Sequence, residues 1–372
     1  MIKRISILSI GVLLLSLFLV SCSDDNDNFT PTTEEKDMGY VFTMTNSNTS
    51  NDLLVYSRDE NGNLSLKSSI ATTGVGSGGG LGSQGALTLS TDKKFLFVVN
   101  AGDNSISSFN VAPNNVTLVG KYNLVGQRPV SVAQRGNLVY VLNSAGATGA
   151  ASIEGFTFNS STGALSPIAN SSTPLSLNTN AAQISFVYDN VIVIAERATN
   201  LLTSYVLNAS SIPTNKQSFS SQAPQPFGFA VGSGGKIYVT EASASSSVSS
   251  YSVSTTGVIS NISTLTNNQG GACWAVLNNA ESIVYSTNAG GNTISSFNIT
   301  SSGVLSATQI AFNMGAGNGP NDAGLSSKGN YLYVLAGGSD KIYGYKVESN
   351  SLTSVAGATM FVPGAAFGLA AY

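Results

Sequence analysis

The stretch Asn100-Ala-Gly-Asp-Asn-Ser-Ile-Ser-Ser-Phe-Asn110 recurs as Asn288-Ala-Gly-Gly-Asn-Thr-Ile-Ser-Ser-Phe-Asn298, with nine of eleven positions identical. The two copies begin 188 residues apart, which is four periods of 47 residues. A period near this length, filled with short strand patterns, indicates radially repeated sheets of four strands. The repeat therefore predicts an all-β chain.

A run rich in Val, Ile, Leu and aromatic residues marks the second strand of each unit. Such runs, bounded by Gly, Asn and Ser, are typical of strands. Seven runs are present: Val41–Asn46, Phe95–Asn100, Leu138–Asn143, Val191–Glu196, Ile237–Glu241, Ile283–Asn288 and Tyr331–Ala336. With the alternating strands and glycine turns that follow them, they predict a seven-bladed β-propeller of four-stranded antiparallel blades over residues 39–372.

The C-terminal tail Phe361–Tyr372 resembles a first strand that no second strand follows. We expect it to complete the blade begun by Val41, which closes the ring and leaves no free sheet edge. The glycine-rich run Gly74–Gly85 contains G-x-G-x-x-G but opens no helix, so a dinucleotide site is not favoured. We expect this run to form the loop that enters the second blade near the channel mouth.

The N-terminus has the pattern of a secretory signal: Lys3 and Arg4 precede an apolar run too short for a membrane span. The ending Leu19-Val-Ser-Cys22 resembles a bacterial lipobox. This resemblance implies a signal peptide over residues 1–21, lipidation of Cys22 and an outer-membrane lipoprotein facing the periplasm or the cell surface. Residues 22–38 predict a flexible acidic tether. The acids in Ser23–Asp27 either act as a surface-export signal or only keep the tether solvated.

Composition excludes several classes of function. Only 9% of residues are charged and the formal net charge is −3, so the basic clusters of a nucleic-acid-binding protein are missing. Histidine is absent, which excludes a Ser-His-Asp triad, a Cys-His pair and a histidine-based metal site. Acid–base chemistry would have to use Asp, Glu, Tyr or Lys. We expect no metal, no cofactor, a monomer, and a buried, inert thiol at Cys273.

Propeller geometry predicts where a site would lie. Residues just before an inner strand and just after a second strand gather at one mouth of the central channel. Arg128 and Arg197 occupy such positions, whereas Arg58 and Arg135 fall in turns on the opposite face.

Further polar and aromatic side chains are predicted at the same mouth, because they end second strands or begin inner strands. They are Glu196, Glu241, Asn100, Asn143, Asn288, Asp322, Gln183, Trp274 and Phe227. A few polar groups among apolar ones are typical of small-molecule sites. The alternative is that the acids pair with neighbours and the asparagines cap strand ends.

Residues 40–372 resemble the lactonase family of seven-bladed propellers, which includes bacterial 6-phosphogluconolactonase-like proteins and fungal carboxymuconate cyclases. The likeness rests on the units around Leu89–Asn100 and Leu325–Leu335 and on Ala195–Asn200, where Glu196 and Arg197 match the family's acidic and basic pair. The family often carries Pro-Arg-His before an inner strand. Here the slot reads Pro320-Asn-Asp322, so a histidine-dependent mechanism does not carry over.

The resemblance implies a lactonase-like hydrolase acting on a small lactone or ester at the channel mouth. Glu196 or Asp322 would act as general base, while Arg128 and Arg197 would hold a substrate carboxylate or polarise the carbonyl. Hydrogen bonds to the oxyanion would come from Asn100, Asn143 and Asn288. Two arginines are few for a phosphate clamp, so a phosphorylated lactone is not expected.

A second hypothesis is a non-catalytic propeller on the cell surface that binds a glycan or a partner protein. Trp274, Phe227 and the asparagines would form its binding platform. The absence of histidine and the predicted tether favour this alternative.

Overall fold

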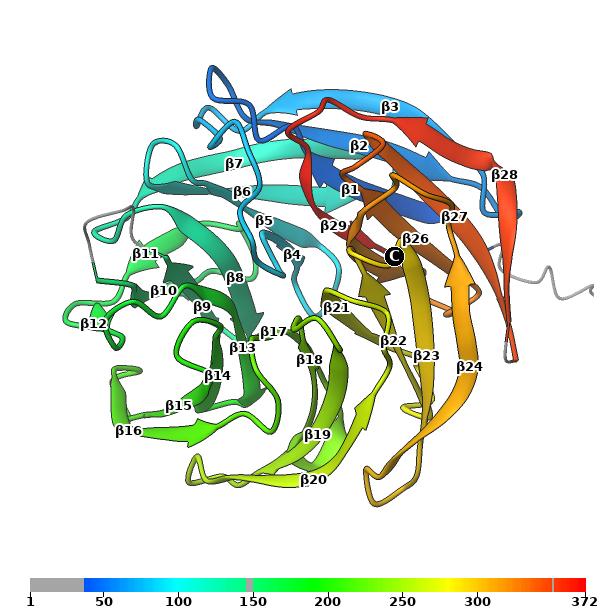
Figure 1. Ribbon diagram of the computed structural model, residues 1–372. Coiled ribbons are helices and arrows are strands. Elements are labelled where there is room, and N and C mark those ends of the chain that lie inside the picture. Colours follow the sequence, from blue (N-terminus) through cyan, green and yellow to red (C-terminus); the bar gives the residue numbers. More distant parts are fainter. Residues whose placement is uncertain (1–36, 145–149, 350) are drawn as a thin grey trace, which may run out of the picture. The chain divides into compact units, whose positions relative to one another are not determined.

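The computed structural model describes residues 37–144, 150–349 and 351–372. The predicted signal peptide, the predicted lipidation site Cys22 and most of the predicted tether lie outside these residues. Seven antiparallel sheets are arranged as blades around a channel, with inner strands such as β13, β17 and β21 toward the centre (Figure 1). The predicted seven-bladed β-propeller is confirmed.

Each blade runs from an inner strand at the channel to an outer strand. The first blade comprises β29 (Phe367–Ala371), β1 (Gly39–Met44), β2 (Asp52–Arg58) and β3 (Leu64–Ala71). The second comprises β4 (Leu87–Leu89), β5 (Phe95–Asn100), β6 (Ser105–Ala112) and β7 (Asn115–Asn123). The third comprises β8 (Pro129–Arg135), β9 (Leu138–Asn143), β10 (Ser152–Phe158) and an outer strand in two pieces, β11 (Leu165–Pro167) and β12 (Thr173–Pro174).

The remaining four blades have the same order. The fourth comprises β13 (Ala181–Tyr188), β14 (Val191–Glu196), β15 (Leu201–Leu207) and β16 (Pro213–Ser220). The fifth comprises β17 (Pro226–Val231), β18 (Lys236–Glu241), β19 (Ser247–Val253) and β20 (Ile259–Thr266). The sixth comprises β21 (Ala272–Leu277), β22 (Ile283–Asn288), β23 (Thr293–Ile299) and β24 (Leu305–Asn313). The seventh comprises β25 (Pro320–Leu325), β26 (Tyr331–Ala336), β27 (Lys341–Glu348) and β28 (Ser351–Phe361).

Burial follows the sequence pattern of each strand. Every residue of β5, β9, β14 and β26 is buried, because second strands pack against neighbouring blades on both faces and therefore read as continuous apolar runs. Outer strands such as β3 and β16 are mostly exposed and polar. The 3₁₀ turn η1 (Ser233–Gly235) is the only helical element among the described residues, and none of these residues forms a helix long and apolar enough to cross a membrane.

The chain closes the ring as predicted from its tail. Strand β29 pairs antiparallel with β1, and Val41 lies opposite Ala371. The pairing of these two strands, here called the seam, extends by one further pair of backbone hydrogen bonds. Tyr372 N–H donates to Tyr40 O at 3.0 Å, and Tyr40 N–H donates to Tyr372 O at 3.2 Å. The first blade is therefore built from both ends of the propeller, and β1 is paired with a strand on each side.

Inner strands have a second edge that no neighbouring strand covers, and side chains from other blades bond to it. Gln183 donates through Nε2 to Phe229 O (2.9 Å) and accepts through Oε1 from Phe229 N–H (2.5 Å). Ser131 Oγ accepts from Ile184 N–H at 3.2 Å. These bonds link the third blade to the fourth and the fourth to the fifth, and they satisfy buried backbone groups.

The inner strand of the fifth blade has a glycine, Gly228, where it faces the channel. The side chain of Gln84, which precedes the second blade, occupies the space beside this glycine. Gln84 donates through Nε2 to Ala275 O (2.9 Å) and accepts through Oε1 from Ala275 N–H (3.1 Å). A Cβ at Gly228 would lie 2.0 Å from Gln84 Oε1 and 2.6 Å from Cys273 O. Glycine at position 228 is therefore required for Gln84 to reach the sixth blade.

Replacing this glycine tests the arrangement. We expect Gly228→Ala to destabilise the protein by about 2–4 kcal/mol, because overpacking adds to the loss of the two Gln84 hydrogen bonds. Gly79→Ala is the matched control, since nothing lies within 4 Å of a Cβ at that position. The midpoint of urea unfolding measures both. Equal midpoints for the two variants would contradict the role assigned to Gln84.

Candidate functional site

The predicted mouth brings Arg128 and Arg197 to the same glycine-rich loop. Arg128 donates through Nη1 to Ser144 Oγ (2.9 Å) and through Nη2 to Gly80 O (3.3 Å). A Cβ at Gly82 would lie 3.4 Å from Arg197 Nη1, so the second guanidinium lies beside the same loop two residues later. Both side chains are half-buried.

Aromatic rings fill the channel beneath Arg197. Its guanidinium carbon lies 5.0 Å from the centre of the Phe227 ring, a cation–π contact. The Phe227 and Trp274 rings are 5.2 Å apart, and Trp274 and Phe367 are 5.9 Å apart. Phe227 and Trp274 are 4% and 3% exposed, so their faces pack in the core and are not an open platform for a ligand.

Burial controls ionisation next to these rings. Burial raises the pKa of the Cys273 thiol to about 11, against a hydrogen bond from Ala289 and the charge of Arg197, which lower it. Burial also lowers the pKa of Arg197, while Cys273 opposes that shift. The thiol is therefore protonated at neutral pH and unsuited to nucleophilic attack.

The two glutamates that end second strands are fully buried within their blades. Glu196 Oε2 accepts from Thr199 Oγ1 (3.0 Å), whereas Oε1 makes no hydrogen bond with the described residues. Glu241 accepts from Ser247 Oγ at 2.7 Å and from Ser221 Oγ at 3.1 Å. Burial raises the pKa of Glu241, and hydrogen bonds from neighbouring hydroxyl groups partly offset this.

The asparagines also point into their own blades. Asn100 Nδ2 donates to two serines of β6, at 3.0 and 2.9 Å, and Asn288 Nδ2 donates to Thr293 and Ser295 of β23, also at 3.0 and 2.9 Å. Asn143 Nδ2 donates to Glu154 Oε1 at 2.8 Å. All three asparagines are fully buried. The structure thus brings the two arginines to the mouth but directs these amides to the third strands.

Asp322 and Gln183 lie deeper, in the wall of the channel. Asp322 Oδ1 accepts from Ala323 N–H (2.8 Å), and Oδ2 accepts from Leu369 N–H (3.1 Å) of the first blade. Burial raises the pKa of Asp322 well above its ordinary value, although these bonds and the nearby Trp274 indole N–H lower it. Asp322 and Gln183 line a cavity of about 280 Å³ together with Lys93. Lys93 lies in a turn on the face opposite the mouth.

The raised pKa of Asp322 predicts how stability depends on pH. The unfolded carboxyl ionises near its ordinary value of about 3.9, while the folded carboxyl ionises only at higher pH. The stability that Asp322 contributes is therefore present below about pH 4 and is lost as the pH rises toward the folded-state pKa. Urea unfolding at several pH values should show this decline in the wild type and a flatter profile in Asp322→Asn. The half-buried turn residue Asp340, changed to Asn, should keep the decline; an unchanged profile in Asp322→Asn would contradict the assignment.

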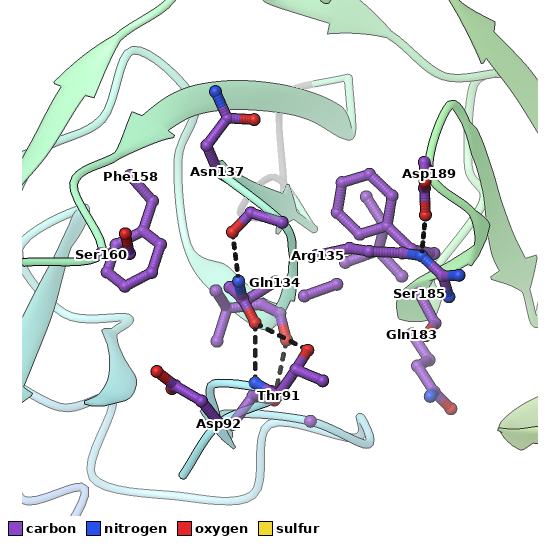
Figure 2. A pocket seen from close by; sticks show the side chains of 17 residues that line it. Thr91, Asp92, Gln134, Arg135, Asn137, Phe158, Ser160, Gln183, Ser185 and Asp189 are labelled. Atoms are coloured by element: carbon purple, nitrogen blue, oxygen red, sulfur yellow. Dashed lines mark hydrogen bonds and ion pairs between the residues drawn. The ribbon is translucent and has the colours of Figure 1, made fainter. Parts of the chain in front are cut away.

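A larger cavity lies on the face opposite the mouth, among the second, third and fourth blades (Figure 2). Its volume is about 730 Å³, against about 280 and 390 Å³ for two other cavities. Arg135 belongs to its wall, in a position that the sequence places on this face without assigning it a site. The described residues contain no cluster of three or more acidic or cysteine side chains suited to a metal ion.

Sequence reasoning did not identify Gln84 or this cavity. The signal for Gln84 is a glutamine at the end of the glycine-rich run together with a glycine at position 228, but the partner Ala275 is 191 residues away. The cavity walls come from turns of three blades, and each turn alone has no distinguishing motif.

Comparison with known proteins gives one family. A family model described as "Lactonase, 7-bladed beta-propeller" matches residues 35–176 and 233–366. No curated protein sequence matches the chain at a significant level.

Similar solved structures span nearly the whole propeller. A candidate 6-phosphogluconolactonase from Bacteroides uniformis has a TM-score of 0.74 and 16% identity, over 90% of this chain and 99% of its own. Another, from Bacteroides fragilis, has a TM-score of 0.69 and 18% identity, over 91% and 99%. The periplasmic gluconolactonase of Pseudomonas aeruginosa has a TM-score of 0.70 and 16% identity, over 89% and 98%. At these identities the likeness concerns the fold.

Proposed function

Because the chain belongs to the lactonase family of seven-bladed β-propellers, we propose that it hydrolyses a small lactone or ester at the channel mouth. The main support for a site at the mouth is that Arg128 and Arg197 both lie beside Gly80–Gly82. Guanidinium groups bind carboxylates and carbonyl oxygens through charged hydrogen bonds. Gly79 and Gly80 have open space around them, so a ligand can approach the backbone between the arginines.

Glu196 is the carboxylate proposed to activate water. It precedes Arg197 in the chain, and its Oε1 makes no hydrogen bond with the described residues. In the proposed step Glu196 takes a proton from water, the oxygen attacks the lactone carbonyl carbon, and the ring C–O bond breaks. The proton passes to the departing alkoxide, which gives a hydroxy acid. Arg197 would stabilise the negative oxygen that forms in between.

The removal of this base is the test. Glu196→Gln preserves the shape and the bond from Thr199, and we expect it to lower turnover at least about a hundredfold. A panel of lactones and esters assayed by proton release measures the effect. Glu281→Gln is the control, because Glu281 binds Ser233 in a surface turn outside the mouth. Turnover that persists in Glu196→Gln would remove this mechanism.

A second function, ligand binding without catalysis, is supported by the full burial of Glu196 and Glu241. In that case the two arginines would bind a carboxylate-bearing ligand and no reaction would follow. The same panel separates the two functions: a ligand that binds but is never turned over favours the binding propeller.

The arginines are common to both functions and can be tested by binding. Arg128→Gln or Arg197→Gln should each weaken the affinity for a carboxylate-bearing lactone about tenfold, because a hydrogen bond to a charged group is lost. Titration calorimetry measures the change. Arg135→Gln, on the opposite face, should leave the affinity unaltered. Equal effects of all three changes would argue against a site at the mouth.

A further inference from the structure

We propose a second binding site on the face opposite the mouth, which takes a neutral saccharide of about two sugar units. The site is the cavity of about 730 Å³ shown in Figure 2, and this volume falls in the range of about 300–1,000 Å³ common for small-molecule sites. It does not depend on hydrolysis at the mouth, because the lining residues contain neither arginine of that site.

The floor of this cavity is apolar and rigid. It is formed by inner strands of the third and fourth blades, where Val132, Ala133, Ile184 and Phe186 are all buried in the largest core cluster. Phe186 packs edge-on against Tyr140 with ring centres 5.9 Å apart. A floor that is part of the core is preorganised, so binding orders few groups.

One amide on the wall is locked in place. Gln134 Oε1 accepts from Thr91 N–H (3.0 Å) and from Thr91 Oγ1 (3.2 Å), while Nε2 donates to Gly136 O (2.7 Å). Figure 2 shows Gln134 fixed in this way between two turns. Its second amide hydrogen is not used by these bonds and is presented in a fixed geometry.

Three more polar side chains on the wall have unused hydrogen-bonding capacity. Asn137, Ser160 and Ser185 make no side-chain hydrogen bonds with other described residues, and they come from three different segments around the cavity (Figure 2). Amides and hydroxyl groups donate and accept, as sugar hydroxyl groups do. Their combination with apolar patches matches a sugar, which has polar edges and apolar faces.

The charges of the cavity are already paired within the protein. Arg135 Nε lies 2.6 Å from Asp189 Oδ1, and Asp92 accepts from Ser90 Oγ at 2.6 Å while lying 3.9 Å from Lys94 Nζ. An anionic ligand would meet two carboxylates and only one guanidinium that is already bonded. The balance of charge therefore favours a ligand without charge over a sugar acid or a sugar phosphate.

Titration calorimetry of the full chain with cellobiose, maltose and lactose tests the site, with glucuronic acid as the charged comparison. We expect at least one neutral disaccharide to bind, and Ser185→Trp, which fills the cavity, to weaken it more than tenfold. The exposed Asn137→Ala, which removes one hydrogen-bonding group without disturbing the core, should weaken it about three- to tenfold. Asn48→Ala, an exposed asparagine on the mouth face, should have no effect.

Three results would overturn the proposal: no neutral disaccharide binds at millimolar concentration, glucuronic acid binds more tightly, or binding is unchanged in both cavity variants. Lactone turnover is measured on the same samples. Turnover that is unaltered in Asn137→Ala, together with weakened disaccharide binding, establishes that the two sites are separate. Loss of turnover in Glu196→Gln leaves the disaccharide result untouched, so each hypothesis can fail alone.

Discussion

The free edge of the inner strands is the constraint on which the rest of this propeller depends. Each inner strand pairs with only one neighbour, and the backbone groups on its other edge are buried in the channel, where an unsatisfied group costs about 1–3 kcal/mol. Gln183, Ser131, Asp322 and Gln84 satisfy these groups across blade boundaries. The main role of these polar side chains in the channel wall is therefore to form the hydrogen bonds that join the blades.

This constraint explains why hydrogen-bonding groups are available to a ligand on the two faces of the propeller and not in the central channel. Channel groups are bonded to backbone, and rings such as Trp274 fill the remaining space. Hydrogen-bonding groups that a ligand can reach occur instead at the arginines of the mouth and around the cavity that contains Asn137 and Ser185. Among the described residues, the arginines lie at these two locations, apart from Arg58, which pairs with Asp37 beside the contact between β1 and β29.

The fold was predictable because its signals are local. Each of these signals predicts a single strand or turn: the repeated segments at Asn100 and Asn288, the seven apolar runs and the unpartnered tail. The direction of side chains at the strand ends was not predictable. Six of the seven inner strands carry a register shift near their start, which changes which residues face the channel. The position of Glu196 at the end of its strand was predicted correctly, whereas its full burial was not.

The contact between Gln84 and the space above Gly228 also restricts how this chain can change over generations. A lineage cannot gain a side chain at position 228 while glutamine at position 84 still reaches Ala275, because the two would occupy the same volume. The substitution at position 84 would have to come first, and it would leave the backbone of Ala275 without its partner until a new residue at position 228 supplied one. Residues in two different blades are in this way inherited as a pair.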